Sequence, residues 1–555
     1  MPFRLQLRTR PREGGERNRD HEVSVLCSRQ CSPSEQPCAA SIVSPHKPAP
    51  AHKWYNTSDP GFDMSTQTVI ATSVRFTGLC SWMERVLTEA ESAAIEFAPD
   101  PVHDLRVALR RCRSLARGYM AIDPDKTWKS MAREGRRLFK SLGELRDVQV
   151  MEHWVSSLAD SSDPFSETML SHLASREQEL KSAAVDALRS FDIEKWRHWI
   201  RRLQRRASRI PSGGAVFQLS ALHAYEEARD LHRRALRNRS SRSYHCLRIG
   251  LKKFRYLVEN FLPLRHEEWG ADLKRLQDCL GEIHDLTVLW ETATRLRAFA
   301  DSETSARWRL RIEEEKAVRL EYYRSRMVGD ESLWTAWRRG LPPPNRLHSL
   351  GLAMVQKWAC LRGAELKQVR DVRRVALRLY AGLYPGHRRS EPSFRSRRTA
   401  LHLAVILRGF ERHLRDSNGQ ETPDKLLDRF PSGTGFSPEL LRLAVIVAQY
   451  SRTKFQKLGK NGLGEIKGAE RASIGELAGI LRLAATLGSN ADPPIRDLSV
   501  ERTTESIVIR IQNYSELGPL AEKAARARYL LEYSCRQPVL ILGLSSSAGS
   551  LPVTD

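Results

Sequence analysis

The sequence predicts a mainly α-helical protein that has two helical domains and a small β-sheet near its C-terminus. From Thr77 onward, apolar residues recur at three- and four-residue spacing in long runs separated by short Pro- and Gly-containing breaks. Short β-branched or apolar segments typical of strands occur only near the end. A chain of 555 residues is too long for one hydrophobic core, so we expect more than one domain.

The chain is strongly basic. It contains 90 Lys and Arg against 66 Asp and Glu, which gives a formal net charge of +24 at pH 7. This excess favours polyanionic partners such as nucleic acid, polyphosphate or an anionic membrane surface. No stretch approaches the length of apolar sequence that a membrane span needs, and the N-terminus lacks the apolar core of a signal peptide. We therefore expect a cytoplasmic protein with no membrane partner.

The pattern divides the chain into five segments. Residues 1–63 are rich in Arg, Ser, Pro and Gly without periodicity, so we expect them to be disordered. Residues 64–340 are typical of a bundle of long antiparallel helices. The run LPPPN at residues 341–345 cannot continue a helix and is predicted to be an interdomain linker. A second domain is expected over residues 346–545, and residues 546–555 form a tail.

The second domain is predicted to be helical to about Leu487 and to end in strands. The candidate strands are residues 498–500, 506–512 and 538–544, which are short and rich in β-branched or apolar residues. We expect them to close the C-terminus as a small antiparallel sheet.

No metal or cofactor site is predicted. Cys27, Cys31 and Cys38 cluster, but they lack the paired spacing of a zinc site. The other cysteines are scattered and are expected to be free thiols in a reducing compartment.

An internal repeat is the most informative feature of the sequence. Residues 102–113 (VHDLRVALRRCR) return as residues 244–255 (YHCLRIGLKKFR), and every basic position matches at a constant offset of 142. A second motif follows each copy, as LGELRD at residues 142–147 and LGEIHD at residues 280–285. Two copies this far apart predict a duplicated helical unit that packs on its twin.

On a helix, each copy of the first motif has one basic and one apolar face. At about 100° per residue, the wedge of the first copy holds His103, Arg106, Arg110, Arg113 and Arg117. The wedge of the second copy holds His245, Arg248, Lys252 and Arg255. Arg111 and Lys253 point off these stripes, and Glu259 stands where the first copy has Arg117.

The ordinary explanation of such a face is a solvated amphipathic helix. A solvated face often mixes charges of both signs, because opposite charges one turn apart attract and like charges repel. Two cationic stripes at the same spacing favour a binding surface instead. Arg can bind phosphate oxygens with two parallel hydrogen bonds, Lys supplies a point charge, and His can donate to an anion while it stays nearly neutral.

The duplicated motif His-x-x-Arg-x-x-x-Arg/Lys-Arg/Lys-x-Arg, followed each time by Leu-Gly-Glu-x-x-Asp, resembles the CHAD family, the conserved histidine α-helical domain. The resemblance covers residues 77–340 and implies two pseudo-symmetric helical halves around a basic cavity that binds inorganic polyphosphate. The implied binding residues are His103, Arg106, Arg110, Arg111, Arg113, His245, Arg248, Lys252, Lys253 and Arg255. A second set, which precedes the second motif and is expected to line the same cavity, is Arg136, Arg137, Lys140, Lys274 and Arg275.

The second domain resembles the C-terminal region of the exopolyphosphatase and guanosine pentaphosphatase family. The similar segments are GFSPEL at residues 435–440, RLAVIVAQYSRTK at residues 442–454 and LRLA at residues 481–484. This resemblance implies an HD-like helical domain, in which His and acidic residues can hold a metal.

The metal ligands of that family are absent from the matching positions. Arg408 and Gly409, Ser451 and Gly488 stand there, and none of them offers a nitrogen or carboxylate ligand. Nearby, His387, His402 and His413 are interpreted as surface or packing residues.

These observations predict non-catalytic binding of polyphosphate, without a cofactor, by a cytoplasmic protein associated with polyphosphate granules. The second domain would add contacts or a surface for a homodimer. Two alternatives stay open. A phosphohydrolase acting on polyphosphate or a phosphorylated nucleotide would need carboxylates and metal that the sequence does not place. A nucleic-acid-binding protein would usually interleave aromatic residues with its cations, and the stripes lack them.

Overall fold

The computed structural model describes residues 78–160, 163–386, 391–409, 427–452 except 429 and 432, and 469–544 except 492. The chain divides into two units, Met1–Ala71 and Thr72–Asp555, and every described residue lies in the second. The predictions for residues 1–63, for the tail at 546–555, and for His387 and His413 lie outside the described residues.

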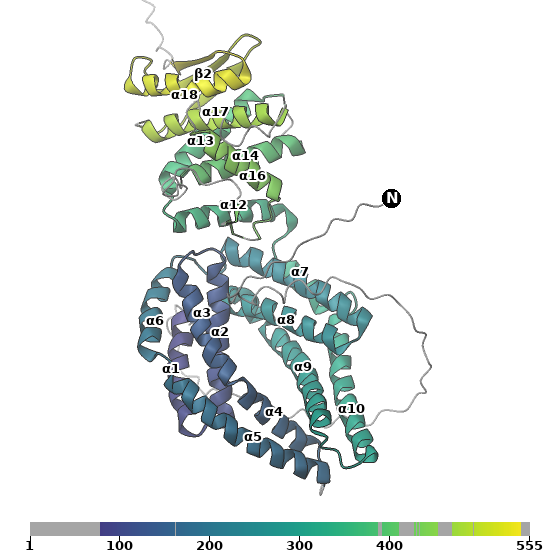
Figure 1. The fold of residues 1–555 in the computed structure, drawn as a ribbon. Coiled ribbons are helices and arrows are strands. Elements are labelled where there is room, and N and C mark those ends of the chain that lie inside the picture. The colour runs from purple at the N-terminus through teal and green to yellow at the C-terminus, as the bar shows by residue number, and fades with distance from the viewer. Residues whose placement is uncertain are drawn as a thin grey trace, which may run out of the picture. The chain divides into compact units, whose positions relative to one another are not determined.

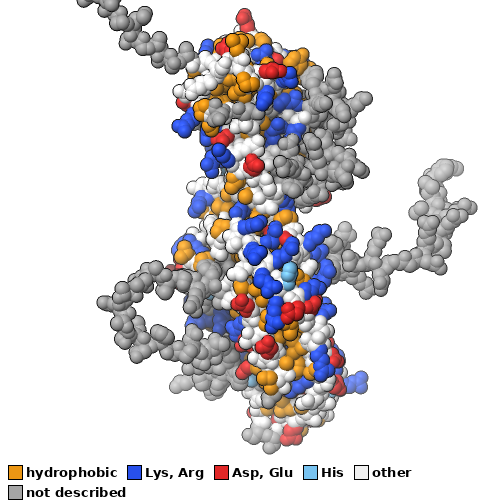
Figure 2. Space-filling model, turned by 90° about the vertical axis from the view of Figure 1, so that its left-hand side faces the viewer, with side chains coloured by type: hydrophobic (Ala, Val, Ile, Leu, Met, Phe, Trp, Pro, Cys, Tyr) orange, Lys and Arg blue, Asp and Glu red, His pale blue; other side chains and the backbone are white. Residues whose placement is uncertain are grey.

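The part of the chain that contains the first copy of the repeat forms six consecutive helices (Figure 1). They are α1 (Leu79–Glu96), α2 (Pro99–Met120), α3 (Lys126–Ser141), α4 (Gly143–Leu158), α5 (Pro164–Arg189) and α6 (Ile193–Ala207). Helix α2 carries the first basic motif and packs against both α1 and α3. Helix α6 lies on the side of the molecule that faces the viewer in Figure 2.

The second copy lies within five helices that repeat this packing. They are α7 (Ala215–Asn238), α8 (Ser241–Phe261), α9 (Pro263–Leu296), α10 (Ser302–Met327) and α11 (Leu333–Gly340). Helix α8 packs against α7 and α9 as α2 packs against α1 and α3. The continuous α9 takes the place of α3 and α4 together, which are separated at Leu142. The predicted duplicated helical unit is therefore confirmed.

Short polar residues begin several of these helices. Asp125 accepts a hydrogen bond from the backbone N–H of Thr127 at 2.8 Å, and Asp163 caps α5 in the same way, where the sequence breaks at Asp163-Pro164. Ser240 caps α8 and Asp301 caps α10. Each such cap typically contributes about 1 kcal/mol, because it satisfies a backbone donor that the helix leaves free.

The apolar faces of α2 and α8 are buried, as the periodicity predicts. Leu105 and Leu109 of α2 and Leu247 and Leu251 of α8 are all inaccessible to solvent. The two helices approach closely near their C-terminal ends, where a Cβ atom added to Gly118 would lie 2.4 Å from the ring of Phe261. This packing turns the basic face of each helix away from the core.

A short segment without helix lies within the predicted linker. Helix α11 ends at Gly340, and α12 (Pro344–Leu361) already begins at Pro344. Proline is tolerated in the first turn of a helix, because the N–H that it lacks has no partner there. The segment between the two helices is therefore residues 341–343, and an interdomain linker over residues 341–345 stays a prediction.

The C-terminal part is helical and ends in a three-stranded sheet. Its elements are α13 (Leu366–Leu383), α14 (Pro392–Arg408), α16 (Pro438–Tyr450), α17 (Ala469–Asn490), β1 (Leu498–Arg502), β2 (Ile507–Gln512), α18 (Pro519–Cys535) and β3 (Val539–Leu544). Ser437 caps α16, since its hydroxyl accepts a hydrogen bond from the N–H of Leu440 at 3.3 Å. All three strands coincide with segments that the sequence predicts.

The prediction of a wholly antiparallel sheet is wrong. Strands β1 and β2 pair antiparallel, with Leu498 opposite Ile511, but β2 and β3 pair parallel, with Ile507 opposite Val539. A parallel pair needs a crossover connection, and helix α18 provides it. The mainly helical fold class with a small C-terminal sheet is otherwise confirmed.

Candidate functional site

Basic side chains from the two copies of the motif meet around Lys252. Helices α2 and α8 are in contact. The pKa of Lys252, on α8, is lowered to about 6 by burial and by the positive charges of Arg110, Arg248, Arg106 and Arg113. Three of these arginines lie on α2. We call these five residues the central cationic cluster.

Two hydrogen-bond donors without partners lie in the cluster and directly beside it. The Nε of Arg110 and the hydroxyl of Tyr256 are buried, and neither has a hydrogen-bond partner among the described residues. The guanidinium of Arg110 and the amine of Lys252 lie 5.9 and 6.0 Å from the centre of the Tyr256 ring. A buried donor without a partner costs about 1–3 kcal/mol, so an anion that accepts its hydrogen bond would be favoured here.

The motif histidines are held neutral at the edge of the cluster. Burial and then the charge of Arg146 lower the pKa of His103 to about 4. Burial and then Arg248 lower the pKa of His284 to about 4, and the same two causes lower that of His245. The rings of His245 and His284 lie 4.7 Å apart, centre to centre. At pH 7 these imidazoles can donate a hydrogen bond without adding positive charge.

The glycine of each Leu-Gly-Glu-x-x-Asp motif makes room for an arginine of the cluster. A Cβ atom added to Gly143 would lie 3.4 Å from Nη1 of Arg106, and one added to Gly281 would lie 4.0 Å from Nε of Arg248. Arg106 also donates a hydrogen bond to the carbonyl oxygen of Phe139 at 3.0 Å. The second motif therefore helps to position the first arginine of the basic motif in both copies.

The aspartate of the same motif lies close to that arginine. Burial raises the pKa of Asp147, and the nearby Arg106 opposes this shift. Burial likewise raises the pKa of Asp285 to about 6 against the opposing effect of Arg248. The arrangement is thus repeated across the duplication.

Three of the ten predicted binding residues are engaged in ion pairs. Arg111 is buried and pairs with Glu259 of α8, and Arg255 lies 3.4 Å from the same carboxylate. Lys253 is exposed and pairs with Glu227 of α7. Arg111 and Lys253 are the two residues that the sequence places off the stripes, so their different contacts follow from their helical positions.

The second predicted set is divided between two faces of the helices. The pKa of Arg113 is lowered to about 10 by burial, by Arg117 and by Arg136, so Arg136 adjoins the cluster. Arg137 points elsewhere, because it donates to the carbonyl oxygen of Ser190 at 2.8 Å. Lys140, Lys274 and Arg275 are exposed on α3 and α9.

Sequence reasoning missed several residues of the site. Arg146, His284 and Tyr256 adjoin the cluster and are not among the predicted binding residues. Arg146 and His284 lie inside the second repeated motif, so the repeat itself was the signal that could have identified them. Tyr256 offered no such signal, since it has no counterpart in the first motif.

In the C-terminal part, the positions that lack metal ligands serve other contacts. Arg408 donates to the hydroxyl of Ser451 at 2.9 Å, and Arg482 donates to the Ser451 carbonyl at 2.8 Å. At Gly488 a Cβ atom would lie 2.8 Å from the backbone of Val372. His402 is partly buried, and burial lowers its pKa to about 4. No group of three His, Cys, Asp or Glu residues suited to a metal ion occurs within the described ranges.

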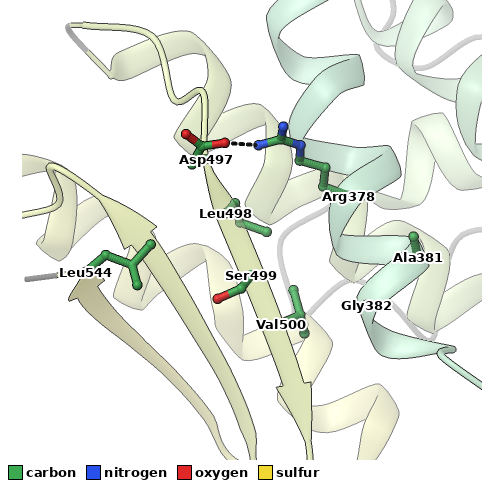
Figure 3. Close-up of a pocket in the computed structure, with 8 residues that line it drawn as sticks. All are labelled: Arg378, Ala381, Gly382, Asp497, Leu498, Ser499, Val500 and Leu544. Atoms are coloured by element: carbon green, nitrogen blue, oxygen red, sulfur yellow. Dashed lines mark hydrogen bonds and ion pairs between the residues drawn. The ribbon is translucent and has the colours of Figure 1, made fainter. Parts of the chain in front are cut away.

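A pocket of about 600 Å³ lies between α13 and the sheet (Figure 3). Its lining residues are Arg378, Ala381, Gly382, Asp497, Leu498, Ser499, Val500 and Leu544. The two charged residues of this lining face one another, since Nη1 of Arg378 lies 3.4 Å from the carboxylate of Asp497. The pocket therefore presents no unpaired charge and lies outside the central cationic cluster.

The fold and the cluster define a duplicated helical unit in which two basic helices converge. Residues 83–294 match the family model of the CHAD domain. A crystal structure of the CHAD domain from the plant Ricinus communis is similar at 22% sequence identity and a TM-score of 0.33, over 48% of this chain and 90% of that chain. No curated protein matches the chain. The match to the family model confirms the CHAD resemblance for residues 83–294, whereas the exopolyphosphatase resemblance stays a prediction. None of the described helices is long and apolar enough to span a membrane.

Proposed function

We propose that the central cationic cluster binds inorganic polyphosphate. The observation that carries this proposal is the position of Lys252 of the second copy among Arg106, Arg110 and Arg113 of the first. Bringing like charges together in a partly buried site opposes folding, as the lowered pKa of Lys252 reflects. A polyanion would neutralise this repulsion, and the match of residues 83–294 to the CHAD domain supports the same ligand.

A linear chain of phosphates fits the spacing of the cations. Arg106, Arg110 and Arg113 follow one another at three- and four-residue intervals on α2. Each helical turn rises about 5.4 Å, so a phosphate chain that runs along the helix would meet one cation at each turn. Arg forks and the Lys amine would bind the oxygens, and the neutral imidazoles would donate further hydrogen bonds.

The aromatic rings beside the cluster argue for polyphosphate over single-stranded nucleic acid. The guanidinium groups of Arg106 and Arg113 lie 4.3 and 5.1 Å from the centre of the Phe139 ring. Tyr256 is buried. Proteins that bind single strands stack bases on exposed aromatic faces, and no such face adjoins the cluster in the described part of the chain.

The pH dependence of binding tests this proposal. Because the pKa of Lys252 is about 6 in the free protein, its amine is mostly neutral at pH 8, and a bound polyanion would raise that pKa. Binding would then take up a proton above pH 6. We expect long-chain polyphosphate to bind more tightly at pH 6 than at pH 8, by up to about tenfold per pH unit.

A binding titration over this pH range, with the parent protein and with Lys252→Gln, provides the measurement. The substitution should weaken binding and flatten the pH profile, because it removes the group that takes up the proton. A parent protein that binds single-stranded nucleic acid more tightly than polyphosphate at matched salt would contradict the proposal.

A further inference from the structure

Helices α3 and α6 carry a second concentration of positive charge. Each contains six Lys or Arg residues and one acidic residue. Their apolar residues are buried, including Trp128 of α3 and Trp196 of α6, so the basic residues lie toward the solvent. We define the outer basic face by six exposed residues, which are Lys129, Arg133 and Lys140 of α3 and Lys195, Arg201 and Arg205 of α6.

The two helices lie side by side and run in opposite directions. Near the end of α3, Arg137 donates to the Ser190 carbonyl, just before α6 begins. Near the start of α3, Asp125 accepts a hydrogen bond from Arg202 at 2.9 Å, close to the end of α6. These two contacts bring the basic faces of the helices together. Figure 2 shows Lys and Arg side chains gathered on this side of the molecule, at the height of α6 in Figure 1.

The charge of this face is not neutralised by its own acids. Glu134 pairs with Arg137, and Glu194 pairs with Arg197. Arg133, Arg201 and Arg205 take part in none of the ion pairs found among the described residues. The face therefore keeps positive charge that a polyanion could neutralise.

The duplication provides an internal comparison for this face. The N-terminal half of α9, residues 263–277, occupies the position in the second copy that α3 occupies in the first. It holds three Lys or Arg residues and three acids, which is the mixture typical of a solvated helix. The fold itself thus does not require a basic surface at this position, and the charge of α3 calls for another explanation.

Helix α3 links the outer basic face to the central cationic cluster. Phe139 of α3 packs beneath Arg106 and Arg113, and Arg136 adjoins Arg113. Lys140 and Arg133, of the outer basic face, lie within one turn of these residues along the same helix. Cations therefore continue from the cluster across α3.

We propose that the outer basic face binds the part of a long polyphosphate chain that extends beyond the central cationic cluster. This inference rests on the proposed function. A flexible phosphate chain can bend across α3 and engage both surfaces at once, and the second engagement then occurs at high effective concentration. Trp196 and Trp199 of α6 are buried, so they offer no platform for stacking bases.

The test compares polyphosphate chains of two lengths. We expect the triple variant Arg133→Gln, Arg201→Gln and Arg205→Gln to lose affinity for long-chain polyphosphate and to keep the parent's affinity for a short chain that fills only the central cluster. Its plot of log affinity against log salt for the long chain should be shallower by about two, at about 0.7 per lost phosphate contact. The matched control replaces three exposed arginines of the second copy with glutamine, at Arg234, Arg237 and Arg295.

Two outcomes would overturn the inference. One is an equal affinity of the parent and the outer triple variant for the long chain. The other is an equal loss of affinity in the control variant, which would indicate a general effect of net charge. If the outer triple variant loses affinity only for single- or double-stranded nucleic acid, the face binds that partner instead. If the parent binds neither chain length, the proposed function itself fails, and this inference fails with it.

Discussion

Replacing Arg110, Arg248 and Lys252 together with glutamine is expected to weaken polyphosphate binding by about a thousandfold. Each lost hydrogen bond to a charged group costs about 1.5 kcal/mol, and every 1.4 kcal/mol of binding free energy changes the affinity about tenfold. The thermal midpoint should change little, because two effects oppose one another. Removing the cations relieves their mutual repulsion, but it also removes the positive charge of Arg248 beside the buried Asp285.

The matched control is Lys253→Gln, one residue farther along α8. Lys253 is exposed and pairs with Glu227, so the structure predicts nearly parental affinity, whereas the family resemblance counts Lys253 among the binding residues. Fluorescence anisotropy with labelled polyphosphate would measure both variants. If the triple variant binds as tightly as the parent, the cluster is not the binding site. If it unfolds, its cations have a structural role.

Replacing Glu259 with glutamine is expected to lower the free energy of unfolding by about 3–5 kcal/mol. The Glu259 side chain is 14% exposed and bridges Arg111, which is 10% exposed, to Arg255. Removing its charge would leave Arg111 buried without a counter-ion. The midpoint of urea denaturation, followed by circular dichroism, would measure the loss.

Glu227→Gln is the control for this prediction. It breaks the exposed pair with Lys253, in which both side chains are at least 50% exposed, so we expect a loss of about 0–1 kcal/mol. Arg111 also keeps the pKa of Glu259 below its ordinary value despite burial. The stabilisation by this pair should therefore be present above the ordinary pKa of glutamate and be lost as the pH falls through the lowered one. Equal losses for the two variants would show that Glu259 does not act as a buried counter-ion.

The sequence predicted the parts of the structure that depend on periodicity. The burial of Leu105 and Leu247 and the basic faces opposite them follow from helical geometry and one repeated pattern. The three strands were found because β-branched residues mark them. The convergence of the two stripes was implied by the duplication and the family resemblance, and helical periodicity alone does not determine which faces of two helices meet.

The remaining features depend on contacts between distant residues. The pairing of Arg111 with Glu259 joins positions 148 residues apart. A helical wheel shows only that Arg111 lies off its stripe and that Glu259 places an acid in line with the other stripe. The room that Gly143 provides for Arg106 becomes evident only when α3 and α4 are packed against α2. The parallel pairing of β3 depends on helix α18, a crossover between the last two strands that strand patterns alone do not reveal.

The stoichiometry of short-chain polyphosphate binding, measured by calorimetric titration, tests the central claim most directly. If Arg110 of α2 and Lys252 of α8 belong to one site, the protein should bind one short chain, and Arg110→Gln and Lys252→Gln should each weaken that single event. Two independent binding events per protein, one removed by each substitution, would contradict the convergence of the two stripes into one site.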